Sequence, residues 1–182
     1  LSHFFFFFLK QTMKIAILDD YYQRARDYAD WDSASFASID FIDHHIANEN
    51  DLVSALQSYD AVGVMRERTP FPKSLIDALP NLKLIVTSGK QNAAIDVAAA
   101  AAKGVTVCGT PSPGHATAEL AFLLVMTLCR KLIPLVNGLK QDHQWQPVMG
   151  SDLRGKTLGI VELGRLGYQA AALGQAIGTD GV

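Results

Sequence analysis

The chain has 182 residues, of which 49% are hydrophobic and 19% charged, and its formal net charge at pH 7 is −2. This length suits one domain, or one domain and part of a second, with enough apolar residues for a sizeable core. The small negative charge gives no electrostatic case for binding to nucleic acid or to an anionic membrane, either of which would call for a basic face. Cys108 and Cys129 lie too far apart for a Cys-x-x-Cys pair, so neither a disulfide framework nor a zinc cluster is indicated. Reduced thiols, and hence a cytoplasmic protein, are expected.

Residues 1–12, LSHFFFFFLKQT, differ from the rest of the chain. No basic residue precedes the phenylalanines and no small-residue cleavage site follows them, so they do not form a signal peptide. The run is also far shorter than the roughly 20 apolar residues of a membrane span. Met13 opens the strand pattern KIAIL. We therefore predict that residues 1–12 are a non-native, disordered leader; the alternative is an N-terminal apolar anchor.

Short apolar runs alternate with helix-like segments along the first part of the chain. The predicted strands are Lys14–Leu18, Ile39–Ile42, Ala61–Met65, Leu82–Val86 and Val105–Val107. The predicted helices are Tyr21–Ala29, Glu49–Ser58, Pro72–Leu79 and Ile95–Lys103. Asn48 is expected to cap one helix, Pro72 to lie in a first turn, and Gly104 to end a third helix. The pattern predicts a doubly wound α/β fold, with a parallel sheet covered on both faces.

The pattern changes after the hinge-like stretch CGTPSPG, and we place a domain boundary near Pro111–Gly114. The segment His115–Leu139 reads as a helix that Pro134 would kink or end. It is apolar on nearly every face, so it is expected to be buried between domains or subunits. A polar loop then leads to TLGIV, a predicted strand over Thr157–Val161, and to a predicted helix over Gly164–Ile177.

The stretch ELGRLG between this strand and helix holds the last two glycines of Gly-x-Gly-x-x-Gly. The second glycine of that motif lets the backbone approach a pyrophosphate, and the third lets the helix pack on the strand. The helix N-terminus offers free N–H groups and the positive end of a dipole to the phosphates. The candidate cofactor-binding residues are therefore Gly164, Arg165, Leu166 and Gly167.

Glu162 stands where the first glycine of the motif belongs. If that position needs a positive φ, a side chain there costs about 1 kcal/mol or more. Its carboxylate would also repel a diphosphate. The alternative is that ELGRLG is only a tight strand-to-helix turn. The acidic residue that binds the ribose is expected about 20 residues further on, and Asp180 precedes the strand that would carry it, so it is not assigned that role.

The runs Ser88–Leu132 and Leu153–Gly167 resemble the D-isomer-specific 2-hydroxyacid dehydrogenases, in particular the D-3-phosphoglycerate dehydrogenase-like members. The resemblance extends from Met13 to about Gly178. It implies a flavodoxin-like substrate (catalytic) domain over residues 13–111. Residues 112–182 would then form a linker helix and the first strand and helix of a Rossmann-type NAD-binding domain. The implied activity is that of an oxidoreductase that transfers hydride between NAD(H) and a D-2-hydroxy or 2-oxo acid, with NADP not distinguished from NAD.

The resemblance also implies site residues. In the family, backbone amides of the loop that corresponds to Ser88, Gly89 and Lys90 hold the substrate carboxylate. RERT, Arg66–Thr69, matches the family's Arg-Ser-x-Thr-like segment, and Arg66 offers a planar fork of donors to an acid group. The alternatives are an ordinary turn at Ser88–Gly89 and solvated charges in RERT.

The family's catalytic Arg, Glu and His have no counterparts in this sequence. The histidines His44, His45, His115 and His143 are not at matching places, so no catalytic residue and no metal site is assigned. We expect an N-terminal fragment that is inactive alone and dimerises through the helix region 117–132. The alternative is a non-catalytic interaction module derived from such an enzyme. A phosphoacceptor receiver domain, suggested by the acids of ILDD, would need an Asp where Met65–Arg66 stand.

Overall fold

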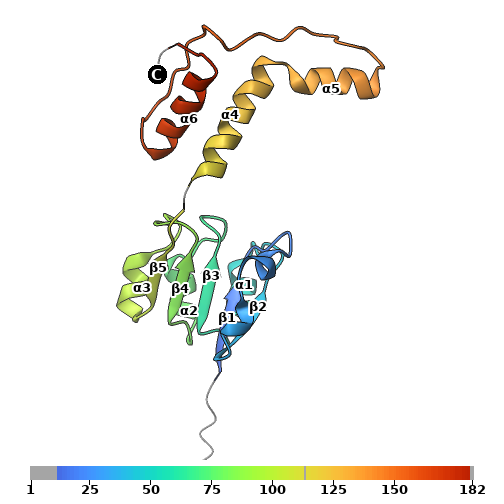
Figure 1. The fold of residues 1–182 in the computed structure, drawn as a ribbon. Helices are drawn as coiled ribbons and strands as arrows, with labels where there is room; N and C mark the ends of the chain where they lie inside the picture. Colours follow the sequence, from blue (N-terminus) through green and yellow to red (C-terminus); the bar gives the residue numbers. More distant parts are fainter. Residues whose placement is uncertain (1–11, 113, 181–182) are drawn as a thin grey trace, which may run out of the picture. The chain divides into compact units, whose positions relative to one another are not determined.

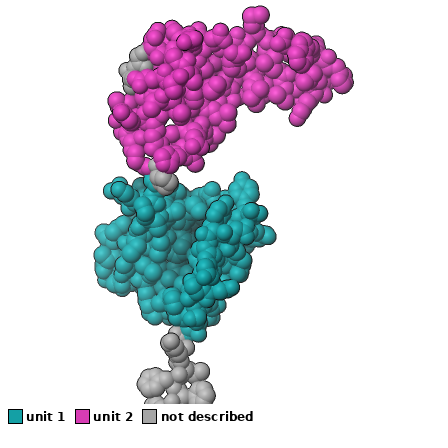
Figure 2. Space-filling model, viewed as in Figure 1, with its two compact units in different colours: residues 1–112 teal, residues 113–182 magenta. Residues whose placement is uncertain are grey.

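The computed structural model describes residues 12–112 and 114–180. The expected leader therefore lies outside the described residues, except for Thr12. The chain divides into two compact units, Leu1–Ser112 and Pro113–Val182, which are coloured separately in Figure 2. Within the described residues, every helix is too short or too polar to cross a membrane.

The first unit is built on one parallel sheet (Figure 1). Its strands are β1 Met13–Ile17, β2 Ala37–Phe41, β3 Ala61–Val64, β4 Leu84–Thr87 and β5 Thr106–Gly109. All neighbouring strands pair in parallel, in the order β2-β1-β3-β4-β5. This is the flavodoxin-like strand order, and the predicted α/β class is confirmed.

Three helices cover one face of the sheet. They are α1 Glu49–Leu56, α2 Lys73–Ala78 and α3 Val97–Lys103. Ala16, Val62 and Ile85 lie on that face and belong to one buried cluster with apolar side chains of all three helices. This clustering arises because the connections that follow β2, β3 and β4 are right-handed crossovers, which place α1, α2 and α3 on the same face of the sheet. The hydrophobic core of the unit therefore lies between the sheet and α1–α3.

The opposite face of the sheet is less completely covered than the sequence pattern predicts. Over β2, the segment after β1 supplies cover: Trp31 meets the Phe41 ring edge-on at 5.3 Å, and the Arg26 guanidinium lies 4.4 Å from the same ring. Further along the sheet, Ile17 and Val86 are only half-buried. The sheet thus has one closed and one partly open face.

The predicted helix Tyr21–Ala29 is wrong. The structure has two short 3-10 turns here, Ala25–Tyr28 and Trp31–Ser33. Gln23 has a left-handed φ of 53°, which an α-helix does not allow. The Asp20 carboxylate accepts hydrogen bonds from the backbone N–H groups of Arg24 at 3.0 Å and Ala25 at 3.2 Å, so a side chain takes over the role of helical carbonyls.

The predicted helix ends agree with the structure. Asn48 caps α1 by accepting hydrogen bonds from the N–H groups of Asn50 and Asp51. Gly104 follows α3 with a left-handed φ of 79°, as expected for a C-terminal glycine. Pro72, expected in a first helical turn, lies one residue before it: it directly precedes α2 in an extended conformation, where its missing N–H costs nothing.

The second unit contains α4 His115–Cys129, α5 Leu132–Gln141 and α6 Arg165–Ala176. The predicted single helix His115–Leu139 is instead broken at Lys131, which has a left-handed φ of 56°. Pro134 does not cause the break; it lies in the first turn of α5, where an N–H has no helical acceptor anyway. The break therefore comes before the proline.

One side of α4 packs against α6, with Ala118 and Phe122 buried. The expected burial of the other faces does not occur within this chain. Four leucines of α4 are 53% to 71% exposed: Leu120, Leu123, Leu124 and Leu128.

The predicted strand Thr157–Val161 is reduced to one parallel bridge, between Thr157 and Asp180. A strand needs a continuous partner for its N–H and C=O groups. Within the described residues only this bridge pairs with the segment, and the Val161 side chain is 94% exposed.

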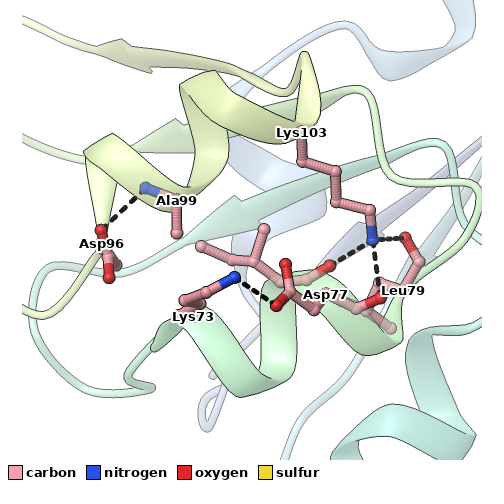
Figure 3. A network of polar contacts seen from close by, with 7 residues as sticks. Lys73, Asp77, Leu79, Asp96, Ala99 and Lys103 are labelled. Carbon is pink, nitrogen blue, oxygen red and sulfur yellow. Dashed lines mark hydrogen bonds and ion pairs between the residues drawn. The ribbon is translucent and has the colours of Figure 1, made fainter.

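Lys103 links α3 to the end of α2 (Figure 3). Its ammonium donates hydrogen bonds to the carbonyls of Ile76, Asp77 and Leu79 at the C-terminal end of α2. We expect Lys103→Met to lower the free energy of unfolding by about 1–3 kcal/mol, since it strips charged hydrogen bonds from partly buried carbonyls. Urea unfolding measures this. Lys73→Met is the control, because the Lys73–Asp77 pair in the same view is exposed and screened by water. Equal losses in the two variants would contradict the capping role.

Candidate functional site

Several polar loops meet at the carboxyl edge of the sheet. Because the strands are parallel, each strand ends at this edge. Asp19 follows β1, Arg66 follows β3, Ser88–Lys90 follow β4, and Thr110 follows β5. Ligands of open α/β sheets bind outside this edge.

Arg66 and Gly89 are in direct contact across this edge. Arg66 is left-handed, with φ 52°, and its N–H donates to the Ser88 hydroxyl at 3.1 Å. A Cβ built on Gly89 would lie 2.5 Å from Arg66 Nη1, and Gly89 itself has φ 113°. The positive φ at Gly89 favours glycine, and the absence of a side chain there leaves room for the Arg66 guanidinium. The structure therefore brings three predicted substrate residues together, with the guanidinium over the loop.

The amides of the Ser88–Lys90 loop are partly engaged already. The Ser88 N–H donates to the Val64 carbonyl at 3.0 Å, as an extension of the sheet. The Gly89 N–H donates to the Thr110 hydroxyl at 3.1 Å. A carboxylate would have to displace this hydroxyl to reach the Gly89 N–H. The exposed Lys90 side chain and the Arg66 guanidinium are more accessible donors.

Gly109 allows the end of β5 to lie against the same loop. A Cβ at Gly109 would come within 2.6 Å of the carbonyl oxygens of Gly89 and Lys90. Thr110 continues the contact, since its N–H donates to the Gly89 carbonyl at 3.0 Å. The loop is thus held from the side by β5.

Sequence reasoning did not identify Asn92 as part of this edge. Its side chain is only 8% exposed, and its Nδ2 donates to the Arg66 carbonyl at 2.6 Å and to the Thr87 hydroxyl at 3.0 Å. A polar residue just beyond the predicted carboxylate loop was the only signal that could have drawn attention to it.

Asp19 is a second buried polar residue at this edge. It is 3% exposed and left-handed, with φ 62°. Its carboxylate accepts hydrogen bonds from the hydroxyls of Thr69 at 2.8 Å and Tyr21 at 2.9 Å, and His45 Nδ1 lies 3.4 Å away. The hydrogen bond to Asp19, together with burial, raises the Tyr21 pKa above its ordinary value of 10.0. The acids of ILDD thus act in hydrogen bonding within the protein.

The glycine turn of the second unit leads directly into α6. Glu162 has a φ of 67°, so the position of the absent first glycine does require a positive φ. A Cβ at Gly164 would meet nothing within 4 Å, which leaves the N-terminus of α6 open. A Cβ at Gly167 would come within 2.5 Å of the Glu162 carbonyl oxygen, so helix and turn are too close for a side chain.

Arg165 and Leu166 begin α6, and both approach Gly114 at the start of α4. A Cβ at Gly114 would lie 2.6 Å from Arg165 Nη1 and 2.7 Å from Leu166 Cδ2. The Arg165 side chain therefore extends along the second unit. Across residues 12–112 and 114–180, no group of three or more His, Cys, Asp or Glu could hold a metal ion.

Replacing Glu162 by glycine should stabilise the turn. We expect Glu162→Gly to raise the local stability of α6 by about 1 kcal/mol, because glycine adopts a positive φ without the Cβ penalty. Gly167→Ala should lower it by about 1–3 kcal/mol through overpacking against the Glu162 carbonyl. Amide hydrogen exchange in α6 measures both changes, and Gly164→Ala, in open space, is the control. A loss of stability in Glu162→Gly would show that the Glu162 side chain stabilises the turn by more than the positive φ destabilises it.

Comparison with known proteins gives consistent matches. The family model for the catalytic domain of D-isomer specific 2-hydroxyacid dehydrogenases matches residues 15–177. The chain is 34% identical to D-3-phosphoglycerate dehydrogenase of Rattus norvegicus over 134 residues, 72% of this chain and 25% of that protein. It is 34% identical to the D-3-phosphoglycerate dehydrogenase of Archaeoglobus fulgidus over 127 residues, 68% of this chain and 24% of that protein.

A solved structure agrees. The phosphoglycerate oxidoreductase of Vibrio cholerae superposes with a TM-score of 0.85 at 35% identity, over 93% of this chain and 55% of that one. The chain thus spans about a quarter of the length of these curated relatives and about half of that of the solved structure. Because the family model covers most of the sequence, the chain belongs to the D-isomer specific 2-hydroxyacid dehydrogenase family.

Proposed function

We propose that this chain forms the substrate-binding part and the start of the cofactor-binding part of an NAD-dependent oxidoreductase. The reaction is hydride transfer between NAD(H) and a D-2-hydroxy acid or its 2-oxo acid. The observation that carries the proposal is the Arg66 guanidinium lying over Gly89 at the carboxyl edge of the sheet. In this proposal residues 13–111 are the substrate domain, and residues 112–182 are the linker helix and the beginning of the NAD-binding domain.

The substrate side uses Arg66, Ser88, Gly89 and Lys90. Arg66 supplies a planar pair of N–H donors that matches a carboxylate. Gly89 leaves room for the Arg66 guanidinium to lie over the loop, and Lys90 adds a second positive charge at the exposed end of the loop. Ser88 orients Arg66, since its hydroxyl accepts the Arg66 N–H. These residues bind and orient an acid group, but none is placed to transfer a proton.

The cofactor side uses the turn at Gly164, Arg165, Leu166 and Gly167. The open space at Gly164 and the positive end of the α6 dipole suit a pyrophosphate. Bound NAD supplies the hydride acceptor or donor. Glu162 weakens this side, because its carboxylate lies two residues before Gly164 and repels phosphate. The turn does not distinguish NAD from NADP.

The family's catalytic Arg, Glu and His have no counterparts among these 182 residues. We therefore expect the chain alone to bind an acid without turning it over.

The unpaired thiols of Cys108 and Cys129 agree with a cytoplasmic location.

Binding of a small acid tests the substrate side. Glycolate should shift the amide resonances of Gly89 and Lys90 in the 182-residue chain. Arg66→Gln should weaken this binding about tenfold or more, because it removes a charged hydrogen bond to the carboxylate. Arg24→Gln is the control, since Arg24 is exposed and paired with Asp27. Equal weakening of glycolate binding in both variants would indicate only non-specific charge attraction. In a separate assay, the 182-residue chain should not oxidise NADH in the presence of 2-oxo acids.

A second role, assembly through α4, is favoured by its exposed leucines. Leu123, Leu124 and Leu128 are each more than half exposed, and contiguous apolar surface of this kind marks protein interfaces. We propose a homodimer through the region 117–132, which would serve either an enzyme or a non-catalytic interaction module.

Light scattering tests the dimer. The chain should have the mass of a dimer, and Leu124→Glu should convert it to a monomer, because a buried unpaired charge is costly at an apolar interface. Val97→Glu is the control, since Val97 is 54% exposed on α3 in the first unit. A monomeric parent chain at micromolar concentration would remove the basis for this role.

A further inference from the structure

The backbone of Arg66 is held in an unfavourable conformation. Its φ of 52° is left-handed, which a residue with a long side chain adopts rarely. Such a conformation persists when the surrounding structure imposes it, and it is frequent where side chains are positioned for function. The Ser88 hydroxyl accepts the Arg66 N–H, and two buried polar residues on other loops hold the segment Arg66–Thr69.

Asn92 holds the first end of the segment Arg66–Thr69. Its Nδ2 donates to the Arg66 carbonyl at 2.6 Å and to the Thr87 hydroxyl at 3.0 Å, and its Oδ1 accepts the Ala94 N–H at 2.9 Å. Asn92, whose side chain makes all these bonds, is buried, with an exposed fraction of 8%. Asn92 therefore joins Arg66 to the loop that contains Gly89.

Asp19 holds the other end of the segment. Its Oδ2 accepts from the hydroxyl of Thr69, which is 2% exposed, at 2.8 Å. Its carbonyl accepts from Arg68 Nη1 at 3.2 Å. The Arg68 guanidinium also lies 4.9 Å from the centre of the Tyr21 ring, and Tyr21 itself donates to Asp19. Asp19 thus ties the segment to the end of β1.

We propose that Asn92 and Asp19 are positioning residues that clamp the segment Arg66–Thr69 from its two ends. The clamp imposes the left-handed conformation of Arg66 and fixes its guanidinium over Gly89. The identity of the anion at Arg66, a 2-hydroxy acid, rests on the proposed function; the clamp itself rests on the hydrogen bonds. A guanidinium fixed in advance binds an acid group with less loss of freedom than a mobile one.

A purely structural role is the competing explanation, and the chain offers a matched control for it. Asp60 also ties strands together through a carboxylate. Its Oδ2 accepts the Lys14 N–H at 2.9 Å and its Oδ1 accepts from Lys83 Nζ at 2.8 Å. These bonds lower the Asp60 pKa, the Lys14 N–H having the largest effect. Asp60 precedes β3, at the opposite edge of the sheet from Arg66.

The experiment compares Asn92→Asp, Asp19→Asn and Asp60→Asn in the 182-residue chain. The first readout needs no ligand: the Cα and Cβ chemical shifts of Arg66 report its left-handed φ. The second readout is glycolate affinity, followed on the amides of Gly89 and Lys90. We expect Asn92→Asp and Asp19→Asn to change the Arg66 shifts and to weaken glycolate binding about tenfold or more. Asp60→Asn should leave both readouts as in the parent chain.

Thr69 provides a second test if Asp19→Asn fails to fold. Thr69→Val removes the hydroxyl donor and should reproduce the changed Arg66 shifts, whereas Thr69→Ser keeps the hydroxyl and should retain the parent values. The proposal is overturned if Arg66 keeps its left-handed shifts in the Asn92 and Thr69→Val variants, or if Asp60→Asn alters both readouts as strongly. If the parent chain binds no glycolate but the Arg66 shifts respond as described, the clamp stands and the proposed substrate is wrong.

Discussion

Parallel strand pairing is the constraint on which the rest of the first unit depends. With the order β2-β1-β3-β4-β5, every strand ends at the same edge, and every chain reversal must cross a face of the sheet. The right-handed crossovers after β2, β3 and β4 place α1, α2 and α3 on one face, where the core forms. Only the crossover from β1 to β2 runs over the opposite face, which explains why Ile17 and Val86 remain half-buried there. One topological choice therefore determines both where the core lies and where the polar loops gather.

The polar edge is organised by the need to satisfy buried groups. Thr69, Thr87 and Asn92 are each less than a tenth exposed. Thr69 donates to Asp19 and Asn92 donates to the Arg66 carbonyl, both on another loop of the edge, and the Thr87 hydroxyl accepts from Asn92. A buried polar group without a partner is costly, so these residues fix the loops relative to one another. Arg66 and Lys90, by contrast, are exposed, so their charged groups are accessible from solvent. The edge thus combines a rigid, internally satisfied base with accessible cations, which is the arrangement that anion recognition requires.

The sequence predicts what depends on local pattern and misses what depends on distant partners. Apolar runs located all five strands of the sheet to within a few residues, and Asn48 and Gly104 marked real helix ends because capping is local. The 3-10 turns after β1 were missed because Asp20 caps the backbone in place of an α-helix. The residues expected to bind substrate and cofactor stay predictions, although three of the substrate residues do meet in space. Asp19 and Asn92 could not be recognised, because their partners Thr69 and Arg66 lie 50 and 26 residues away in the sequence.

The glycine turn shows that a residue with a side chain can adopt a backbone conformation that favours glycine. Glu162 has a φ of 67°, and a residue with a Cβ pays about 1–2 kcal/mol for this conformation. Gly167 explains why the turn does not simply relax: its missing side chain lets the Glu162 carbonyl lie against α6, where a Cβ would be 2.5 Å away. Close packing at the third glycine thus holds the first position in a shape that suits glycine. The first position can therefore vary at the expense of stability, whereas the third cannot vary without moving the helix, so the third glycine is the better marker of this turn.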